Sequence, residues 1–158
     1  MSQGKICGPM GCEEALEHPR RETPPGLPVL LVVAAALIDK DGRVLLAQRP
    51  EGKEMAGLWE FPGGKVKEGE TPEFALVREI HEELGIETCE SCYSPIAFAS
   101  HSYEDFHLLM PLFACRTWRG EVQAKEHKAI KWVRPQDMGD YPMPAADVPL
   151  VSQLRDLI

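Results

Sequence analysis

Residues 64–86 read GKVKEGETPEFALVREIHEELGI and contain the clearest helix signal of the chain. Thr71 is a good N-cap residue, and Pro72 fits the first helical position, where no backbone N–H is needed. Apolar side chains then recur every four residues, at Leu76, Ile80 and Leu84. Gly85 suits the left-handed residue that follows a helix end. The stretch therefore predicts a helix over residues 72–84 with one apolar face that packs into a core.

The opposite face of this helix is acidic, with Glu79, Glu82 and Glu83 three and four residues apart. Like charges at this spacing repel one another and destabilise the helix unless a cation lies among them. A cluster of hard carboxylate oxygens suits Mg²⁺, Mn²⁺ or Ca²⁺ better than zinc. The alternative interpretation of such a triplet is a solvated acidic face.

A longer pattern favours the metal interpretation. Nine positions match the Nudix box, G-x5-E-x7-R-E-U-x-E-E-x-G-U with U aliphatic: Gly64, Glu70, Arg78, Glu79, Ile80, Glu82, Glu83, Gly85 and Ile86. The segments 45–50, 56–65 and 141–150 also resemble the MutT-like branch of the Nudix hydrolases. The resemblance runs from Val29 to the C-terminus and excludes the first 28 residues.

The resemblance implies the metal-binding and catalytic residues. In the family, Glu79, Glu82 and Glu83 would bind Mg²⁺, with Mn²⁺ as a substitute, together with the main-chain carbonyl of Gly63. Glu126 matches a further glutamate ligand from a late loop. By the same resemblance, the neighbouring carboxylates would be oriented by Arg78. The base that accepts a proton from water is either Glu79 or Glu126, and the sequence leaves both open.

The resemblance also implies four substrate-binding residues. Arg49 matches an arginine that contacts phosphates, and Glu60 lies in the matching segment that precedes the box. Phe61 matches an aromatic side chain that stacks on the base, although simple core packing is an equal alternative. Asp147 stands where guanine-specific relatives usually carry asparagine. An ionised aspartate only accepts hydrogen bonds and can donate to O6 of guanine only when protonated. The alternative role of Asp147 is to cap the closing helix.

The rest of the chain predicts one domain over residues 29–158 after an irregular extension over residues 1–28. Strands are expected at 29–38, 43–48, 58–61, 93–102, 107–117 and 129–133, and a closing helix at 148–157. Asp39 to Gly42 has the composition of a hairpin turn, and Pro62-Gly63-Gly64 is expected to break the third strand. The fold class is therefore α/β (α+β), a Nudix α/β/α sandwich whose mixed central sheet lies between helices.

Composition limits the partners. The formal net charge of −8 argues against a nucleic-acid surface, and no apolar run is long enough to span a membrane. Five cysteines, an odd number, favour reduced thiols and a cytoplasmic location. A zinc site made of Cys7, Cys12, Cys89 and Cys92 is the less favoured alternative. We expect a small-molecule nucleotide as the ligand of a monomer or homodimer.

The sequence thus predicts a Mg²⁺-dependent enzyme that hydrolyses nucleoside triphosphates to monophosphates and pyrophosphate. The first hypothesis for the substrate is 8-oxo-dGTP, which implies a role in nucleotide-pool sanitation and DNA repair. The alternatives are a hydrolase of CTP or oxidised pyrimidine triphosphates and a non-catalytic nucleotide-sensing module.

Overall fold

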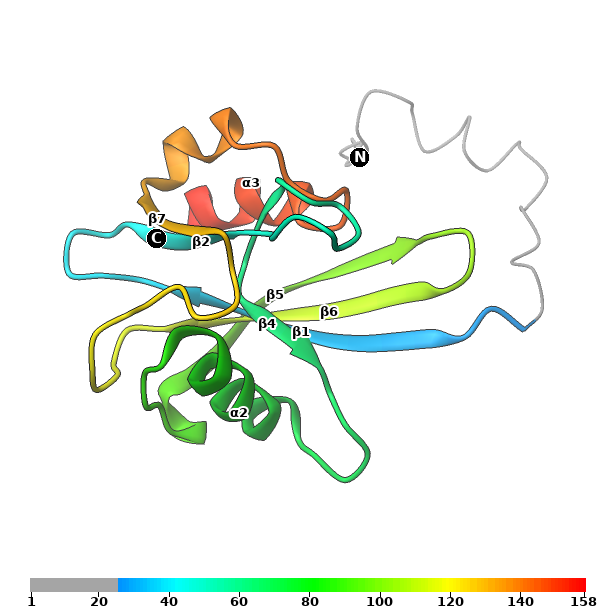
Figure 1. The fold of residues 1–158 in the computed structure, drawn as a ribbon, viewed down its shortest axis with the longest axis horizontal. Coiled ribbons are helices and arrows are strands. Elements are labelled where there is room, and N and C mark those ends of the chain that lie inside the picture. Colours follow the sequence, from blue (N-terminus) through cyan, green and yellow to red (C-terminus); the bar gives the residue numbers. More distant parts are fainter. Residues whose placement is uncertain (1–25) are drawn as a thin grey trace, which may run out of the picture.

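The computed structural model describes residues 26–158, so the predicted extension over residues 1–28 lies almost wholly outside it. Two sheets form the body of the domain, a four-stranded one in the order β4-β1-β6-β5 and a three-stranded one in the order β3-β2-β7 (Figure 1). The elements in chain order are β1 (Val29–Leu37), β2 (Val44–Gln48), β3 (Trp59–Glu60), β4 (Gly63–Lys65), α2 (Pro72–Leu84), η1 (Glu90–Cys92), β5 (Tyr93–Ser102), β6 (His107–Cys115), β7 (Ala129–Val133), η2 (Pro135–Asp140) and α3 (Val148–Leu157).

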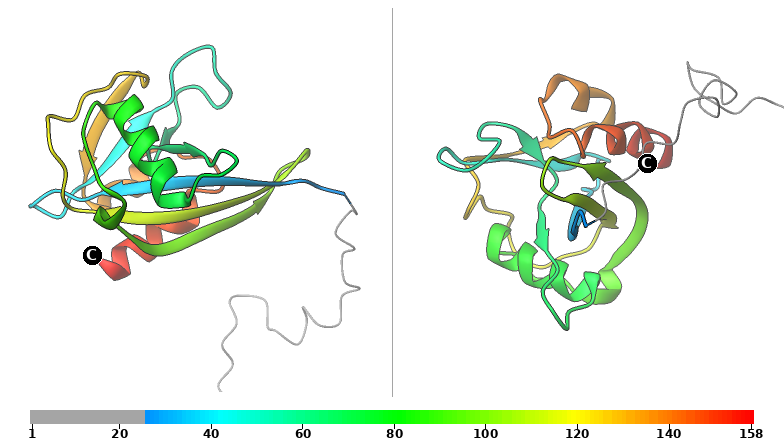
Figure 2. Two further views of the ribbon diagram at one scale, coloured as in Figure 1. Left: turned by 90° about the horizontal axis from the view of Figure 1, so that it is seen from below. Right: turned by 90° about the vertical axis from the view of Figure 1, so that its right-hand side faces the viewer.

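The central strand β1 divides the core into two halves. It runs parallel to β6 and antiparallel to β4, so the larger sheet is mixed. Alternate side chains of a strand point to opposite faces. Val33, Ala35 and Leu37 accordingly pack under α2, whereas Ala34 and Ala36 belong to the cluster that also contains residues of η2 and α3. Figure 2 shows α2 and α3 on opposite sides of the strands, which confirms the predicted sandwich.

The helix α2 begins and ends where the sequence predicts. The Thr71 side chain accepts a hydrogen bond from the Phe74 N–H at 3.2 Å, which satisfies one of the unpaired donors of the first turn. Gly85 has a φ of 72° and donates to the His81 carbonyl at 3.0 Å. The apolar face of α2, formed by Leu76, Ile80 and Leu84, is fully buried. Both ends of the helix that carries the acidic face are therefore fixed.

The first residue of β1, Val29, is 65% exposed, and the rest of the strand is partly or fully buried. Two details of the strand prediction are wrong. The turn at Asp39 forms, yet β1 and β2 belong to different sheets and share only the bridge between Ile38 and Val44. The third strand ends at Glu60 and is broken as expected, but Gly63–Lys65 within this break forms a further strand, β4, that pairs with β1.

The cysteine prediction is also wrong for one pair, since the structure joins Cys89 and Cys92 in a disulfide. Cys115 is a free, buried thiol, and Cys7 and Cys12 lie outside the described residues. No helix within residues 26–158 is long and apolar enough to cross a membrane.

Candidate active site

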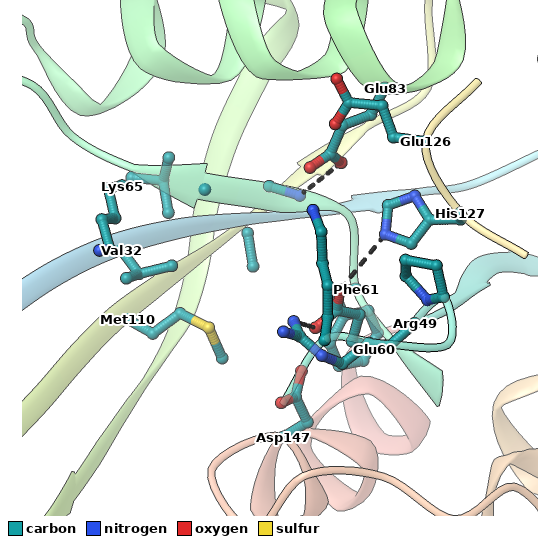
Figure 3. Close-up of a pocket in the computed structure, with 16 residues that line it drawn as sticks. Val32, Arg49, Glu60, Phe61, Lys65, Glu83, Met110, Glu126, His127 and Asp147 are labelled. Atoms are coloured by element: carbon teal, nitrogen blue, oxygen red, sulfur yellow. Dashed lines mark hydrogen bonds and ion pairs between the residues drawn. The ribbon is translucent and has the colours of Figure 1, made fainter. Parts of the chain in front are cut away.

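A cleft opens where β4 meets the smaller sheet and the start of α3. Seven residues predicted from the sequence line it, and they come from five separate stretches of chain: Arg49, Glu60, Phe61, Gly63, Glu83, Glu126 and Asp147. His127 and two lysines, Lys53 and Lys65, also line it and were not predicted. Figure 3 shows Glu83 and Glu126 at one end of this cleft and Asp147 at the other, with Glu60 between them.

Glu83 is the buried carboxyl group of the acidic end. It projects from α2 with 8% of its surface exposed and accepts a hydrogen bond from the Gly63 N–H at 3.2 Å. Its pKa is raised to about 9, chiefly by burial and also by the charges of Glu79, Glu60 and Glu126, while the hydrogen bond from Gly63 lowers it. The negative charges of three neighbouring glutamates therefore act on one buried carboxyl group.

Gly63 and Gly64 allow this close approach. A Cβ atom on Gly63 would overlap the carbonyl oxygen of Val33 on β1. A Cβ atom on Gly64 would overlap the carboxyl group of Glu79. At Gly63, the backbone of β4 therefore lies directly against the central strand, which leaves no space for a side chain, and at Gly64 a side chain would displace the carboxyl group of Glu79.

Arg78 holds the outer carboxyl groups in place. Its Nε donates to Glu70 at 2.6 Å and its Nη1 to Glu79 at 2.7 Å, while Nη2 donates to the Lys65 carbonyl at 3.2 Å. Glu82 lies 3.6 Å from the same guanidinium. The hydrogen bonds from Arg78 lower the pKa of Glu70 to about 2. These contacts agree with the orienting role expected of Arg78.

The predicted metal ligands are near one another but are not assembled into a site. Within residues 26–158, no three His, Cys, Asp or Glu side chains are close enough together to hold a metal ion. Glu79 is paired with Arg78, and the side chain of Glu82 is 47% exposed. The donor set still fits a hard divalent cation, because it consists of carboxylate oxygens and the charges of Glu79, Glu60 and Glu126 add to the effect of burial in raising the pKa of Glu83.

Three hydrogen-bonded side chains, Arg49, Glu60 and His127, occupy the middle of the cleft. Arg49 follows β2, and its Nη1 donates to Glu60 Oε2 at 2.9 Å while its Nε donates to the Glu54 carbonyl at 2.8 Å. The other oxygen of Glu60 lies 3.2 Å from Nε2 of His127. Arg49 is thus fixed on two sides, and its remaining N–H groups have no hydrogen-bond partner within residues 26–158, so they can meet an anion in the cleft.

Asp147 forms the far end of the cleft. It precedes α3 at the N-cap position, but its side chain makes no capping hydrogen bond, so the alternative capping role is not observed. Only 5% of its surface is exposed. Its pKa is raised to about 7, chiefly by burial and also by the charge of Glu60, while the Phe61 backbone and Arg49 lower it. The carboxyl group therefore carries its proton near neutrality much more often than an exposed aspartate does.

Phe61 lines the cleft but is 4% exposed and belongs to the core cluster beside α3. Its ring therefore presents little area for stacking. Two other aromatic side chains, Tyr103 and Phe106, lie 5.1 Å apart between ring centroids and line an adjoining hollow that also includes Asp147. Both residues lie in the connection between β5 and β6, which places their rings together beside Asp147.

Comparison with known proteins gives a consistent result. The model of the NUDIX domain family matches residues 33–153. The CTP pyrophosphohydrolase of Escherichia coli is 44% identical over 130 residues, which cover 81% of this chain and 93% of that protein. The 8-oxo-dGTP diphosphatase of Proteus vulgaris is 38% identical over 97 residues, which cover 61% and 85% of the two chains. The crystal structure of a MutT NUDIX hydrolase from Burkholderia pseudomallei has a TM-score of 0.69 at 31% identity and covers 79% of this chain and 97% of its own.

Proposed function

This chain belongs to the NUDIX domain family as a MutT-like nucleotide pyrophosphohydrolase, and we propose that its preferred substrate is 8-oxo-dGTP, cleaved with Mg²⁺. The products are 8-oxo-dGMP and pyrophosphate. Family members of this kind use divalent metal ions, and the choice of Mg²⁺ rests on the oxygen-only donors around Glu83. The observation that carries the choice of base is the buried Asp147, whose pKa is raised to about 7.

At the acidic end, the proposed ligands of Mg²⁺ are the carboxylates of Glu79, Glu82, Glu83 and Glu126 and the carbonyl of Gly63. A bound divalent cation supplies positive charge to the polyphosphate and acidifies water. The convergence of carboxyl groups on the buried Glu83 supports this assignment, since a divalent cation offsets their repulsion. Arg78 holds the carboxyl group of Glu79 beside the backbone of Gly64.

The proposed reaction adds water to the β-phosphorus and breaks its bond to the oxygen that bridges the α- and β-phosphorus atoms. The monophosphate leaves with this oxygen. A carboxylate accepts one proton from the attacking water, and Glu79 and Glu126 are the two groups placed to do so. Among residues 26–158, Arg78 pairs with Glu79 whereas no cation pairs with Glu126, which favours Glu126. Arg49 supports the phosphates with its free N–H groups.

At the other end, a neutral Asp147 replaces the asparagine expected in guanine-specific relatives. A protonated carboxyl group donates from its O–H and accepts at its C=O, as an amide does. Guanine presents O6 and N7 as acceptors on one edge, whereas 8-oxoguanine carries a hydrogen on N7. One neutral carboxyl group can therefore donate to O6 and accept from N7–H, and it meets an acceptor at N7 of unoxidised guanine.

The alternative substrate is CTP, favoured by the identity to the Escherichia coli CTP pyrophosphohydrolase over most of both chains. Asp147 also suits cytosine, whose amino group donates to a carboxylate in either protonation state. The presence of every Nudix-box glutamate argues against a sensing module without turnover.

A panel of 8-oxo-dGTP, dGTP and CTP, assayed with Mg²⁺ for release of pyrophosphate, separates these substrates. We expect kcat/KM for 8-oxo-dGTP to exceed that of the other two by about 10-fold or more, since each discriminating hydrogen-bond pair contributes about 1–3 kcal/mol. A higher value for CTP would establish the alternative. Release of inorganic phosphate instead of pyrophosphate would contradict the proposed point of cleavage.

A further inference from the structure

The side chain of His127 reaches Glu60 across 67 positions of sequence. It follows Glu126 in the loop before β7, and only 6% of the side chain is exposed. Its Nε2 lies 3.2 Å from Oε1 of Glu60, whereas its Nδ1 is buried and has no hydrogen-bond partner among the described residues. A buried imidazole with only one bond is costly to place, so this contact calls for a functional explanation.

The chemistry of the contact fixes which nitrogen carries the hydrogen. A carboxylate only accepts hydrogen bonds, so Nε2 of His127 must donate to Glu60. The opposite tautomer would set a lone pair of the ring against the carboxylate oxygen. His127 lines the cleft, whereas its Nδ1 is buried.

Glu60 is therefore bound at both oxygens, by Arg49 at 2.9 Å and by His127 at 3.2 Å. Figure 3 shows it between His127 on the side of Glu83 and Asp147 on the other side. With Oε1 unbound, the carboxylate would be free to turn toward a cation at the acidic end. Arg49 would then lose the partner that directs its guanidinium into the cleft.

We propose that His127 is a positioning residue, which together with Arg49 clamps the Glu60 carboxylate and so presents Arg49 to the phosphates of the bound nucleotide. This inference rests on the proposed triphosphate substrate, but not on the identity of its base. The ring itself touches neither the phosphates nor the reacting water in this role.

Three substitutions at His127 test the clamp. In glutamine, the amide nitrogen reaches about as far as Nε2 of histidine, whereas in asparagine it stands near the place of Nδ1. We expect His127→Ala and His127→Asn to raise KM about 10-fold with kcat within about 3-fold, and His127→Gln to stay within about 3-fold of the wild type, because a hydrogen bond to a charged group is restored only by glutamine. Rescue by asparagine and not by glutamine would overturn the proposal.

A binding measurement supplies a readout apart from turnover. The probes are the α,β-methylene analogues of dGTP and CTP with Mg²⁺, which cannot be cleaved at the proposed bond. We expect His127→Ala to weaken both analogues alike, by about 10-fold, since the contact of Arg49 is with phosphates. His107→Ala is the matched control, because its ring is bonded to Ser100 and Ser102 outside the cleft.

A double-mutant cycle shows whether the effect passes through Glu60. We expect His127→Ala to add less than about 2-fold to the loss already caused by Glu60→Gln, since both changes break the same clamp. Independent, multiplicative losses would contradict it, as would unchanged binding in His127→Ala. Failure of the wild type to bind either analogue would instead refute the proposed function, and the clamp with it. Thermal unfolding of each variant identifies those that fold.

Discussion

The cleft has a buried carboxyl group at each end, and the two differ in what surrounds them. Glu83 faces Glu79, Glu60 and Glu126, and burial with their charges raises its pKa to about 9. Asp147 faces only Glu60 as a like charge and has Arg49 nearby, and its pKa is raised to about 7. Burial is the largest cause of the raised pKa in both cases. Of the two groups, Glu83 is the one on which the charges of several carboxylates act.

This difference indicates two ways of tolerating a buried acid. At Glu83, the proposed divalent cation would neutralise the group and its neighbouring carboxylates together. At Asp147, Glu60 is the one like charge among residues 26–158 that raises the pKa, and the group is tolerated by keeping its proton. Glu60 lies between the two and raises the pKa of both. We expect metal binding and base selection to respond to different substitutions.

The largest expected effect is that of Glu83→Gln, which should lower kcat by about 10²-fold through loss of a metal ligand. Mg²⁺ should raise the Tm of the wild type, because a ligand of the folded state stabilises it, and should do so much less in this variant. Measured side by side, Asp147→Asn should retain the full Mg²⁺ effect on Tm.

Glu87→Gln is the matched control for Glu83→Gln, since Glu87 is exposed just beyond the end of α2. Equal loss of the Mg²⁺ effect in the variants at Glu83 and Asp147 would show that the two ends of the cleft do not divide these tasks.

Gly64→Ala should have the next largest effect. The new Cβ atom would overlap the carboxyl group of Glu79, which must then leave its place beside Arg78. Displacements of about 1 Å in an active site can cost about 10²-fold, so we expect kcat to fall by about 10- to 10²-fold. The preference between 8-oxo-dGTP and dGTP should not change, because Asp147 is untouched.

Gly139→Ala is the control for Gly64→Ala, because nothing lies within 4 Å of a Cβ atom at Gly139 and its φ is not in the left-handed range. A Gly64→Ala variant with full activity would refute the need for close contact between β4 and the acidic helix.

The two ends of the cleft were predictable from sequence to different degrees. The helix limits followed from Thr71 and Gly85, whose capping chemistry is local. Glu83 could be identified because its spacing is set within one helix. In contrast, strand β4 was missed because two glycines carry no pattern of side chains, and its pairing with β1 depends on backbone contacts alone.

At Asp147, the sequence offered capping and base recognition as alternatives and could not supply its burial, which decides its protonation. His127 was missed because a single histidine in a loop has no periodicity, and its partner Glu60 is 67 residues away. Features that depend on one element are thus readable from its sequence, whereas contacts between distant elements require the structure.

Asp147→Asn should have the smallest and most specific effect. The pKa of this carboxyl group is about 7 in the folded protein, whereas that of an unperturbed aspartate is 3.8. Between these two pH values the folded state keeps a proton that the unfolded chain releases. The free energy of unfolding of the wild type therefore falls as pH rises from about 4 to about 7 and then levels off. Because asparagine does not titrate, the free energy of unfolding of Asp147→Asn lacks this fall with rising pH. Between pH 5 and pH 8, the stability of Asp147→Asn relative to the wild type should rise by about 2 kcal/mol, or about 5 °C in Tm.

Catalysis should follow the same proton at Asp147. Above pH 7 the ionised carboxylate no longer donates to O6, so the wild-type ratio of kcat/KM for 8-oxo-dGTP over dGTP should fall several-fold, while asparagine keeps the ratio constant. Asp137→Asn, a change at an exposed position of η2, is the control for the loss of one charge. A ratio with the same pH dependence in the wild type and Asp147→Asn would mean that the proton at Asp147 does not select the base. The contrast with Glu83 would then be one of metal binding alone.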